Sequence, residues 1–96
     1  MQTIANRPGE WSYVIGPYRE PVATVKPGET FSVETADAFE NKIDSPRADI
    51  TKLIQLPYVN PLTGPIFVEG AEKGDALAVT VNSIDVTREY GVSVLI

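Results

Sequence analysis

The chain contains neither cysteine nor histidine. Without cysteine it forms no disulfide and offers no thiolate to a metal or a substrate. Without histidine it lacks the commonest general base, the usual partner of a serine or cysteine nucleophile, and the commonest transition-metal ligand. A metal bound by this chain alone would therefore have oxygen ligands, which suit Ca²⁺ or Mg²⁺ better than Zn²⁺.

Basic residues are few and scattered. Eight lysines and arginines stand against 13 aspartates and glutamates, so the formal net charge is −5. Because no basic cluster is present to release counterions, we expect no nucleic-acid partner. No apolar run is long enough to span a bilayer, and residues 1–10 lack the apolar core of a signal peptide. The sequence thus predicts a cytoplasmic protein with no membrane partner.

The composition that remains is that of a folded domain. Hydrophobic residues make up 43% of the chain, which is too high for intrinsic disorder. The 96 residues are enough for one small domain or a piece of a larger one. Residues 1–10 are polar and are predicted to be flexible, and residues 11–96 are predicted to form a single β-rich domain. The expected fold is all-β or β-dominated, with antiparallel hairpins in a small barrel or sandwich and one short helix.

Alternating and β-branched runs predict the strands of this fold. The longest candidate, residues 75–86, changes phase near Asn82 and Ser83, which predicts a β-bulge there. Pro27 and Gly28 stand in the order of a type II turn. The predicted strands cover residues 11–15, 22–25, 30–35, 66–68, 75–86 and 90–96.

Two further segments have local signals. Ser45 and Pro46 resemble a helix start and predict a helix of about two turns, with a loop of helical tendency as the alternative. Residues 91–96 are apolar and stop without a polar cap or turn. Because an unpaired apolar edge invites aggregation, we expect this last strand to pair with the rest of a longer protein, a separate subunit or a second copy.

Residues 60–75 combine a turn, a short strand and a second turn. Pro61 biases Asn60 to an extended backbone, while Gly64 is free to adopt a backbone that other residues avoid. Thr63 and Gly64 between two prolines therefore predict a tight turn of special shape. Ordinary turns between hairpin strands are the alternative interpretation of this stretch.

Three blocks of sequence together resemble one family. They are Gly-Pro-Tyr-Arg-Glu-Pro-Val-Ala-Thr-Val-Lys-Pro-Gly-Glu at 16–29, Glu-Thr-Ala-Asp-Ala-Phe at 34–39, and Asn-Pro-Leu-Thr-Gly-Pro-Ile-Phe-Val-Glu-Gly-Ala-Glu-Lys-Gly-Asp at 60–75. Their order and approximate spacing are similar to the N-terminal part of the acetamidase/formamidase family. The resemblance implies a larger β-rich homo-oligomer that hydrolyses short linear amides, such as formamide and acetamide, to the acid and ammonia.

The resemblance also implies that this chain is incomplete. It stops before the second half, where the family carries a histidine-containing segment and a Gln-Gly-Asp-Gly-Glu motif. A divalent metal, Zn²⁺ or Ca²⁺, is implied for the intact enzyme, and little activity is expected from this chain alone. The alternative from another functional class is a non-catalytic β-domain that serves assembly or binding.

Hydrolysis of an amide needs an activated water, a stabilised carbonyl oxygen and a proton for the leaving nitrogen. Asp37 follows an alternating strand directly and falls in a block that resembles the family, so it is the candidate catalytic carboxylate and metal ligand. Its alternative role is to cap a turn. Asn60, Thr63 and Gly64 are the candidate substrate-binding residues, because a glycine turn exposes backbone N–H groups to a carbonyl oxygen. A rigid turn is the alternative.

Overall fold

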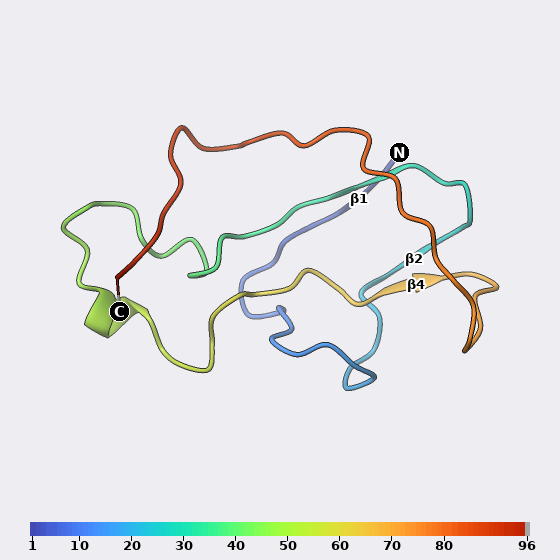
Figure 1. The fold of residues 1–96 in the computed structure, drawn as a ribbon, viewed down its shortest axis with the longest axis horizontal. Coiled ribbons are helices and arrows are strands. Elements are labelled where there is room, and N and C mark those ends of the chain that lie inside the picture. The colour runs from blue at the N-terminus through green and yellow to red at the C-terminus, as the bar shows by residue number, and fades with distance from the viewer. Residues whose placement is uncertain (96) are drawn as a thin grey trace.

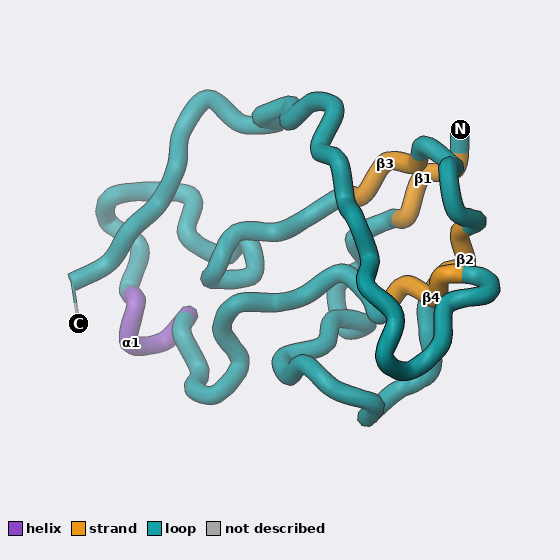
Figure 2. The backbone as a smooth tube through the Cα atoms, turned by 45° about the vertical axis from the view of Figure 1, so that its right-hand side comes forward, coloured by secondary structure: helices purple, strands orange, loops and turns teal. Residues whose placement is uncertain are grey.

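The structure is a computed structural model that describes residues 1–95. Short strands and a single helical turn are joined by long loops, and the strands lie at the end of the molecule opposite to the helix (Figure 1; Figure 2). The β-rich character that the sequence predicts is confirmed. The elements are β1 (Gln2–Ile4), β2 (Ala23–Val25), β3 (Phe31–Val33), α1 (Ile50–Leu53) and β4 (Ile66–Val68).

The strands pair in parallel, so the prediction of antiparallel hairpins is wrong for these elements. In residues 1–95, β1 pairs with β3 and β2 pairs with β4, as two separate two-stranded sheets rather than a closed barrel. Both pairs join segments distant in sequence, since Ile4 faces Val33 and Val25 faces Val68 in register. A turn sets where the chain reverses, but it does not decide which strand becomes the neighbour.

The turn between β2 and β3 illustrates this distinction. The Glu29 N–H donates to the Lys26 carbonyl at 3.0 Å, and Gly28 has a φ of +82°. The predicted type II turn with glycine at its third position is therefore confirmed. Instead of closing a hairpin, it leads the chain from the β2–β4 sheet to the β1–β3 sheet (Figure 2).

The N-terminal stretch, predicted to be flexible, contains a strand. β1 lies beside β3, and Ile4 at its end is only 4% exposed. The Glu34 N–H extends the pairing by donating to the Ile4 carbonyl at 3.0 Å. Three residues are too few for a pattern to be recognised in sequence, and the burial of one isoleucine against a distant segment is what orders them.

Strands predicted at 11–15, 75–86 and 90–96 do not form within residues 1–95. The first contributes one antiparallel bridge, in which Ser12 and Leu62 exchange backbone hydrogen bonds of 3.1 and 2.7 Å. The second has no assigned strand and no neighbouring strand, so there is no ladder in which a bulge at Asn82 and Ser83 could form. The third has no strand in residues 90–95, and Ile96 lies outside the described residues.

The helix is shorter and starts later than the sequence predicts. Ser45 closes a turn, accepting the Arg47 N–H at its hydroxyl and the Ala48 N–H at its carbonyl, both at 3.1 Å. Asp49 is the actual cap of α1, since its carboxylate accepts the Thr51 N–H at 3.1 Å. Ser45 and Asp49 are both able to cap a helix, and in the structure Asp49 does so. Among residues 1–95, no helix has the length and apolar character needed to cross a bilayer.

Candidate functional site

The two segments with candidate site residues lie side by side. The Asn60 N–H donates to the Ala38 carbonyl at 2.7 Å, and the Thr63 hydroxyl donates to the Glu34 carbonyl at 2.7 Å. Residues 34–38 therefore run along residues 60–63. The structure thus brings the segment that carries Asp37 next to the turn that carries Thr63, as a shared site would require.

Asp37 itself organises a turn. Its Oδ1 accepts the Phe39 N–H at 2.8 Å and the Asn41 N–H at 3.0 Å, while the Asn41 side chain accepts the Asp37 N–H at 3.1 Å. Its Oδ2 forms an ion pair with Arg88 at 2.5 Å, and the Asp37 side chain is only 16% exposed. Arg88 in turn lies 4.9 Å from the ring centroid of Tyr90. Both carboxylate oxygens are therefore already bonded.

These contacts keep Asp37 ionised. Burial acts to raise the pKa of Asp37, but the hydrogen bond from Arg88 and those from the Asn41 and Phe39 N–H groups outweigh it, so the pKa is lowered. The same pairing raises the pKa of Arg88. At neutral pH the group is a carboxylate, which suits a base or an electrostatic role and not an acid. The catalytic role of Asp37 stays a prediction.

The described residues do not by themselves fit a divalent metal. Within residues 1–95, no three Asp or Glu side chains come together as a ligand set. The Asp37 oxygens face a guanidinium and two N–H groups, all of which are hydrogen-bond donors and would compete with a cation. Asp37 as a metal ligand therefore stays a prediction that this arrangement does not favour.

The backbone has positive φ angles at both ends of the 60–64 turn. Gly64 has a φ of +146°, as expected for a glycine between two prolines. Asn60 has a φ of +58°, so the prediction of an extended backbone at this residue is wrong. Asparagine tolerates the left-handed region better than most residues, and its N–H is held by the Ala38 carbonyl. A tertiary hydrogen bond here overrides the preference that Pro61 imposes.

Thr63 is the centre of a polar network that links three segments. Its hydroxyl accepts from the Asn6 Nδ2 at 3.1 Å while donating to the Glu34 carbonyl. Asn6 also accepts the Trp11 indole N–H at 2.9 Å, and its own N–H donates to the Glu34 carboxylate at 3.0 Å. The sequence gives no local signal for Asn6, because its partner Thr63 lies 57 positions away.

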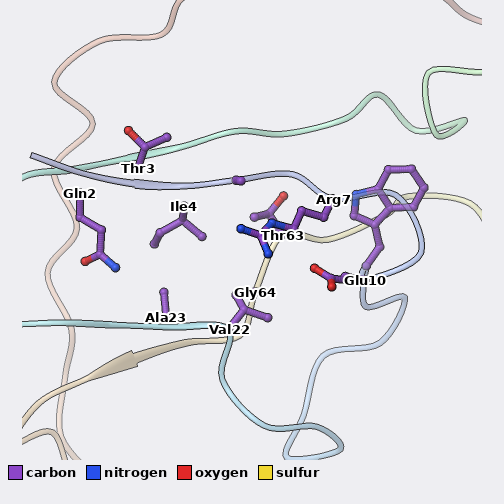
Figure 3. Close-up of a pocket in the computed structure, with 11 residues that line it drawn as sticks. Gln2, Thr3, Ile4, Arg7, Glu10, Val22, Ala23, Thr63 and Gly64 are labelled. Atoms are coloured by element: carbon purple, nitrogen blue, oxygen red, sulfur yellow. The ribbon is translucent and has the colours of Figure 1, made fainter.

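A small open cavity adjoins this network. Its volume is about 180 Å³. We name it the N-terminal cavity, because residues from the start of the chain form most of its wall, and Thr63 and Gly64 close it from the other side (Figure 3). Neither Asp37 nor Asn60 lines it. The structure therefore places two of the three predicted substrate-binding residues at a cavity, together with Ile4, Arg7, Glu10 and Trp11.

A second polar cluster was not anticipated from the sequence. The Tyr13 hydroxyl donates to the Glu40 carboxylate, and Lys42 forms an ion pair with the same carboxylate at 2.9 Å. Tyr13 also packs edge-to-face on Tyr58, with ring centroids 5.3 Å apart. The hydrogen bond to Glu40, with some burial, raises the pKa of Tyr13 to about 12. The hydrogen bonds from Tyr13 and Lys42 lower the pKa of Glu40.

Tyr13 should titrate above the ordinary pKa of a tyrosine, which is 10.0. Because the folded state holds the Tyr13 proton more tightly than the unfolded state, its contribution to stability is complete below the ordinary pKa of 10.0 and is lost as pH rises towards about 12. Tyrosinate absorbance followed through this pH range should show one of the four tyrosines titrating late. Tyr13→Phe should abolish that late step.

Tyr18→Phe is the matched control, because Tyr18 is 74% exposed and should leave the late step unchanged. A late absorbance step that is missing, or that is unchanged in Tyr13→Phe, would contradict the Tyr13–Glu40 contact. At the acidic end the sign is reversed, since the stability contributed by Glu40 is present above its ordinary pKa of 4.5 and is lost as pH falls.

Comparisons with known proteins agree on one family. The model of the Acetamidase/Formamidase family matches residues 15–95. A formamidase of Methylophilus methylotrophus is 41% identical over 61 residues, and an acetamidase of Mycolicibacterium smegmatis is 40% identical over 63 residues. The crystal structure of an acetamidase from Yersinia enterocolitica is similar to 67% of this chain, with 47% identity and a TM-score of 0.62.

The β-rich fold and the matched segment define the chain's class. This chain belongs to the Acetamidase/Formamidase family, which confirms the resemblance seen in its sequence. The matched segments are 62% and 65% of this chain but only 15% of the formamidase and 16% of the acetamidase. The similar region is likewise 19% of the solved acetamidase chain. The chain therefore spans a small part of the relatives that it matches.

Proposed function

We propose that the complete protein hydrolyses short linear amides, such as formamide and acetamide, to a carboxylate and ammonia. In this proposal residues 1–96 are its N-terminal portion and are inactive alone. The observation that carries the proposal is the family match over residues 15–95, reinforced by 47% identity to an acetamidase of similar fold. These residues contribute scaffold and one wall of the site, while the rest of the protein supplies the remaining catalytic groups.

Each candidate residue has a role in this proposal. Asp37 is the ionised carboxylate that the chain offers to the reaction, supported by its lowered pKa and its place beside the 60–63 segment. Thr63 and Gly64 bind substrate at the N-terminal cavity, and Asn60 holds their turn against Ala38. A divalent metal, Zn²⁺ or Ca²⁺, would take its ligands from the rest of the protein, because the described residues do not form a set for it.

The assembly is also part of the proposal. We infer that the complete chain closes these short strands into a larger barrel or sandwich and forms a homo-oligomer. The last apolar segment pairs with the remainder of the amidase or with a second subunit. Exposed apolar side chains along residues 75–86 support this view, since a complete fold would cover them; they are Leu77, Val79, Val81, Ile84 and Val86. A cytoplasmic location, which the sequence predicts, is part of the same proposal.

Ammonia release tests the proposal. The complete protein and the 96-residue chain are each incubated with formamide or acetamide, with and without added Zn²⁺ or Ca²⁺, and ammonia is measured. We expect turnover by the complete protein and none by the 96-residue chain, because in this proposal the rest of the protein supplies the remaining catalytic groups. A complete protein that releases no ammonia would favour the alternative of a non-catalytic assembly or binding domain. Activity of the short chain would contradict its proposed dependence on the remainder.

A further inference from the structure

The turn at residues 7–10 projects two opposite charges from its two ends. The Glu10 N–H donates to the Arg7 carbonyl at 3.0 Å, and Gly9 has a φ of +86° after Pro8. This is the backbone of a type II turn, with proline and glycine in their preferred places. Arg7 and Glu10 are therefore its first and last residues, and both line the N-terminal cavity.

Both charges are available to a ligand. Among residues 1–95, no ion pair joins Arg7 to Glu10 or to another side chain. In Figure 3, Arg7 and Glu10 both lie at the end of the cavity that carries Thr63 and Gly64. Arg19 stabilises the turn by donating from its guanidinium to the Glu10 carbonyl at 2.7 Å. Within residues 1–95, the Glu10 carboxylate accepts no hydrogen bond and forms no ion pair. The cavity thus offers a donor group and an acceptor group, and their formal charges cancel.

The rest of the wall combines polar and apolar side chains, with Gln2, Thr3 and Thr63 among the polar ones. Ile4, Val22 and Ala23 contribute aliphatic carbon, and Gly64 contributes no side chain (Figure 3). A volume of about 180 Å³ is below the range of about 300–1,000 Å³ that drug-sized ligands occupy, so the cavity suits a smaller molecule. A fitting ligand is small and uncharged overall. It has a carbonyl oxygen for the guanidinium, an N–H group for the carboxylate and a short alkyl group for the aliphatic wall.

We propose that the N-terminal cavity binds a short aliphatic primary amide, whose carbonyl oxygen accepts from Arg7 and whose NH₂ group donates to Glu10. This inference rests on the proposed function and assigns a part of its substrate site. Arg7, Glu10 and Trp11 all precede residue 15, where the family match begins. The orientation of the amide is therefore set by residues that the family match does not include, and these residues are specificity determinants of this protein.

The experiment uses Trp11 as its probe. Trp11 is the chain's single tryptophan and lines the cavity, so its fluorescence reports on the occupant. Titration of the 96-residue chain with acetamide should give a saturable change in emission. Arg7→Gln should weaken binding by about tenfold, because a charge-assisted hydrogen bond is lost, and Glu10→Gln should weaken it less. Arg47→Gln is the matched control, since Arg47 is exposed and does not line the cavity.

Several results would overturn the inference. A change that grows linearly with acetamide, or equal affinity in Arg7→Gln and the unaltered chain, would mean that the cavity is not the site. Tighter binding of acetate would make it an anion site, and tighter binding of glycine would make it a zwitterion site. If the circular dichroism spectrum shows that Arg7→Gln is unfolded, Arg7→Lys takes its place. Lysine keeps the positive charge but lacks the planar guanidinium, so Arg7→Lys should still bind acetamide more weakly than the unaltered chain.

The outcome is separable from that of the proposed function. A complete protein that releases ammonia while the short chain shows no saturable fluorescence change would overturn only the assignment of the N-terminal cavity. Conversely, the 96-residue chain could bind acetamide while the complete protein releases no ammonia. That result would overturn only the proposed hydrolysis.

Discussion

Replacing Asp37 by alanine should lower the free energy of unfolding by about 2–3 kcal/mol, because two N–H groups and the Arg88 guanidinium lose their acceptor. The carboxylate is 16% exposed, so water replaces only part of what is lost. Such a change is a large fraction of the total stability of a small domain, which is about 5–15 kcal/mol. Urea unfolding followed by circular dichroism measures the effect.

Asp37→Asn separates the role of Asp37 in the turn from the effect of its negative charge. The amide oxygen of asparagine still accepts the Phe39 and Asn41 N–H groups, so only the ion pair to Arg88 is lost, and the cost should fall to about 1–2 kcal/mol. In the complete protein, this variant should stay folded and lose turnover by about a hundredfold or more if the carboxylate takes part in proton transfer. Unchanged ammonia release would remove Asp37 from the reaction and leave it as the residue that holds the turn.

Ile4→Ala should lower the free energy of unfolding by about 2–4 kcal/mol, since the removed carbon atoms are buried from solvent. Ile4 is 4% exposed, and only Val25 and Ile43 are comparably buried among the apolar residues of the described chain. Loss of this anchor should release β1 from β3, so the backbone amides of both strands should exchange hydrogen faster.

Val33→Ala is the matched control for this prediction. Val33 faces Ile4 in the register of the β1–β3 pair but is 37% exposed, so its truncation should cost less than about 1 kcal/mol. Equal effects of the two substitutions would mean that β1 is held by its backbone hydrogen bonds alone. No effect of either would support a flexible N-terminus, as the polar composition of residues 1–10 predicts.

Turns were the most predictable part of the fold. The shapes at Gly28 and Gly64 follow from proline and glycine, whose allowed φ values are properties of the residues themselves. β2, β3 and β4 also lie where β-branched and aromatic residues concentrate. The direction of pairing was not predictable, because parallel and antiparallel neighbours of a three-residue strand present the same side chains.

The candidate site was predictable only in part. Thr63 and Gly64 do line a cavity, and Gly64 has the positive φ that the two prolines around it led us to expect. Asp37 and Asn60 lie nearby and do not line it, since their polar groups are committed to Arg88 and Ala38. Arg7 could have been found from its place in a proline–glycine turn, but nothing in its own segment indicates the wall that faces it.

The sequence by itself determined the local turns, the lack of imidazole and thiol chemistry, and the family, since each of these depends on residue identity and order. Only the tertiary structure decided that Asp37 would meet Arg88, 51 positions away, and that Asn6 would meet Thr63 across 57 positions. The physical reason is that such contacts form only where the rest of the chain brings distant segments together in space. That choice is made by the whole chain and leaves no periodic signal in either segment.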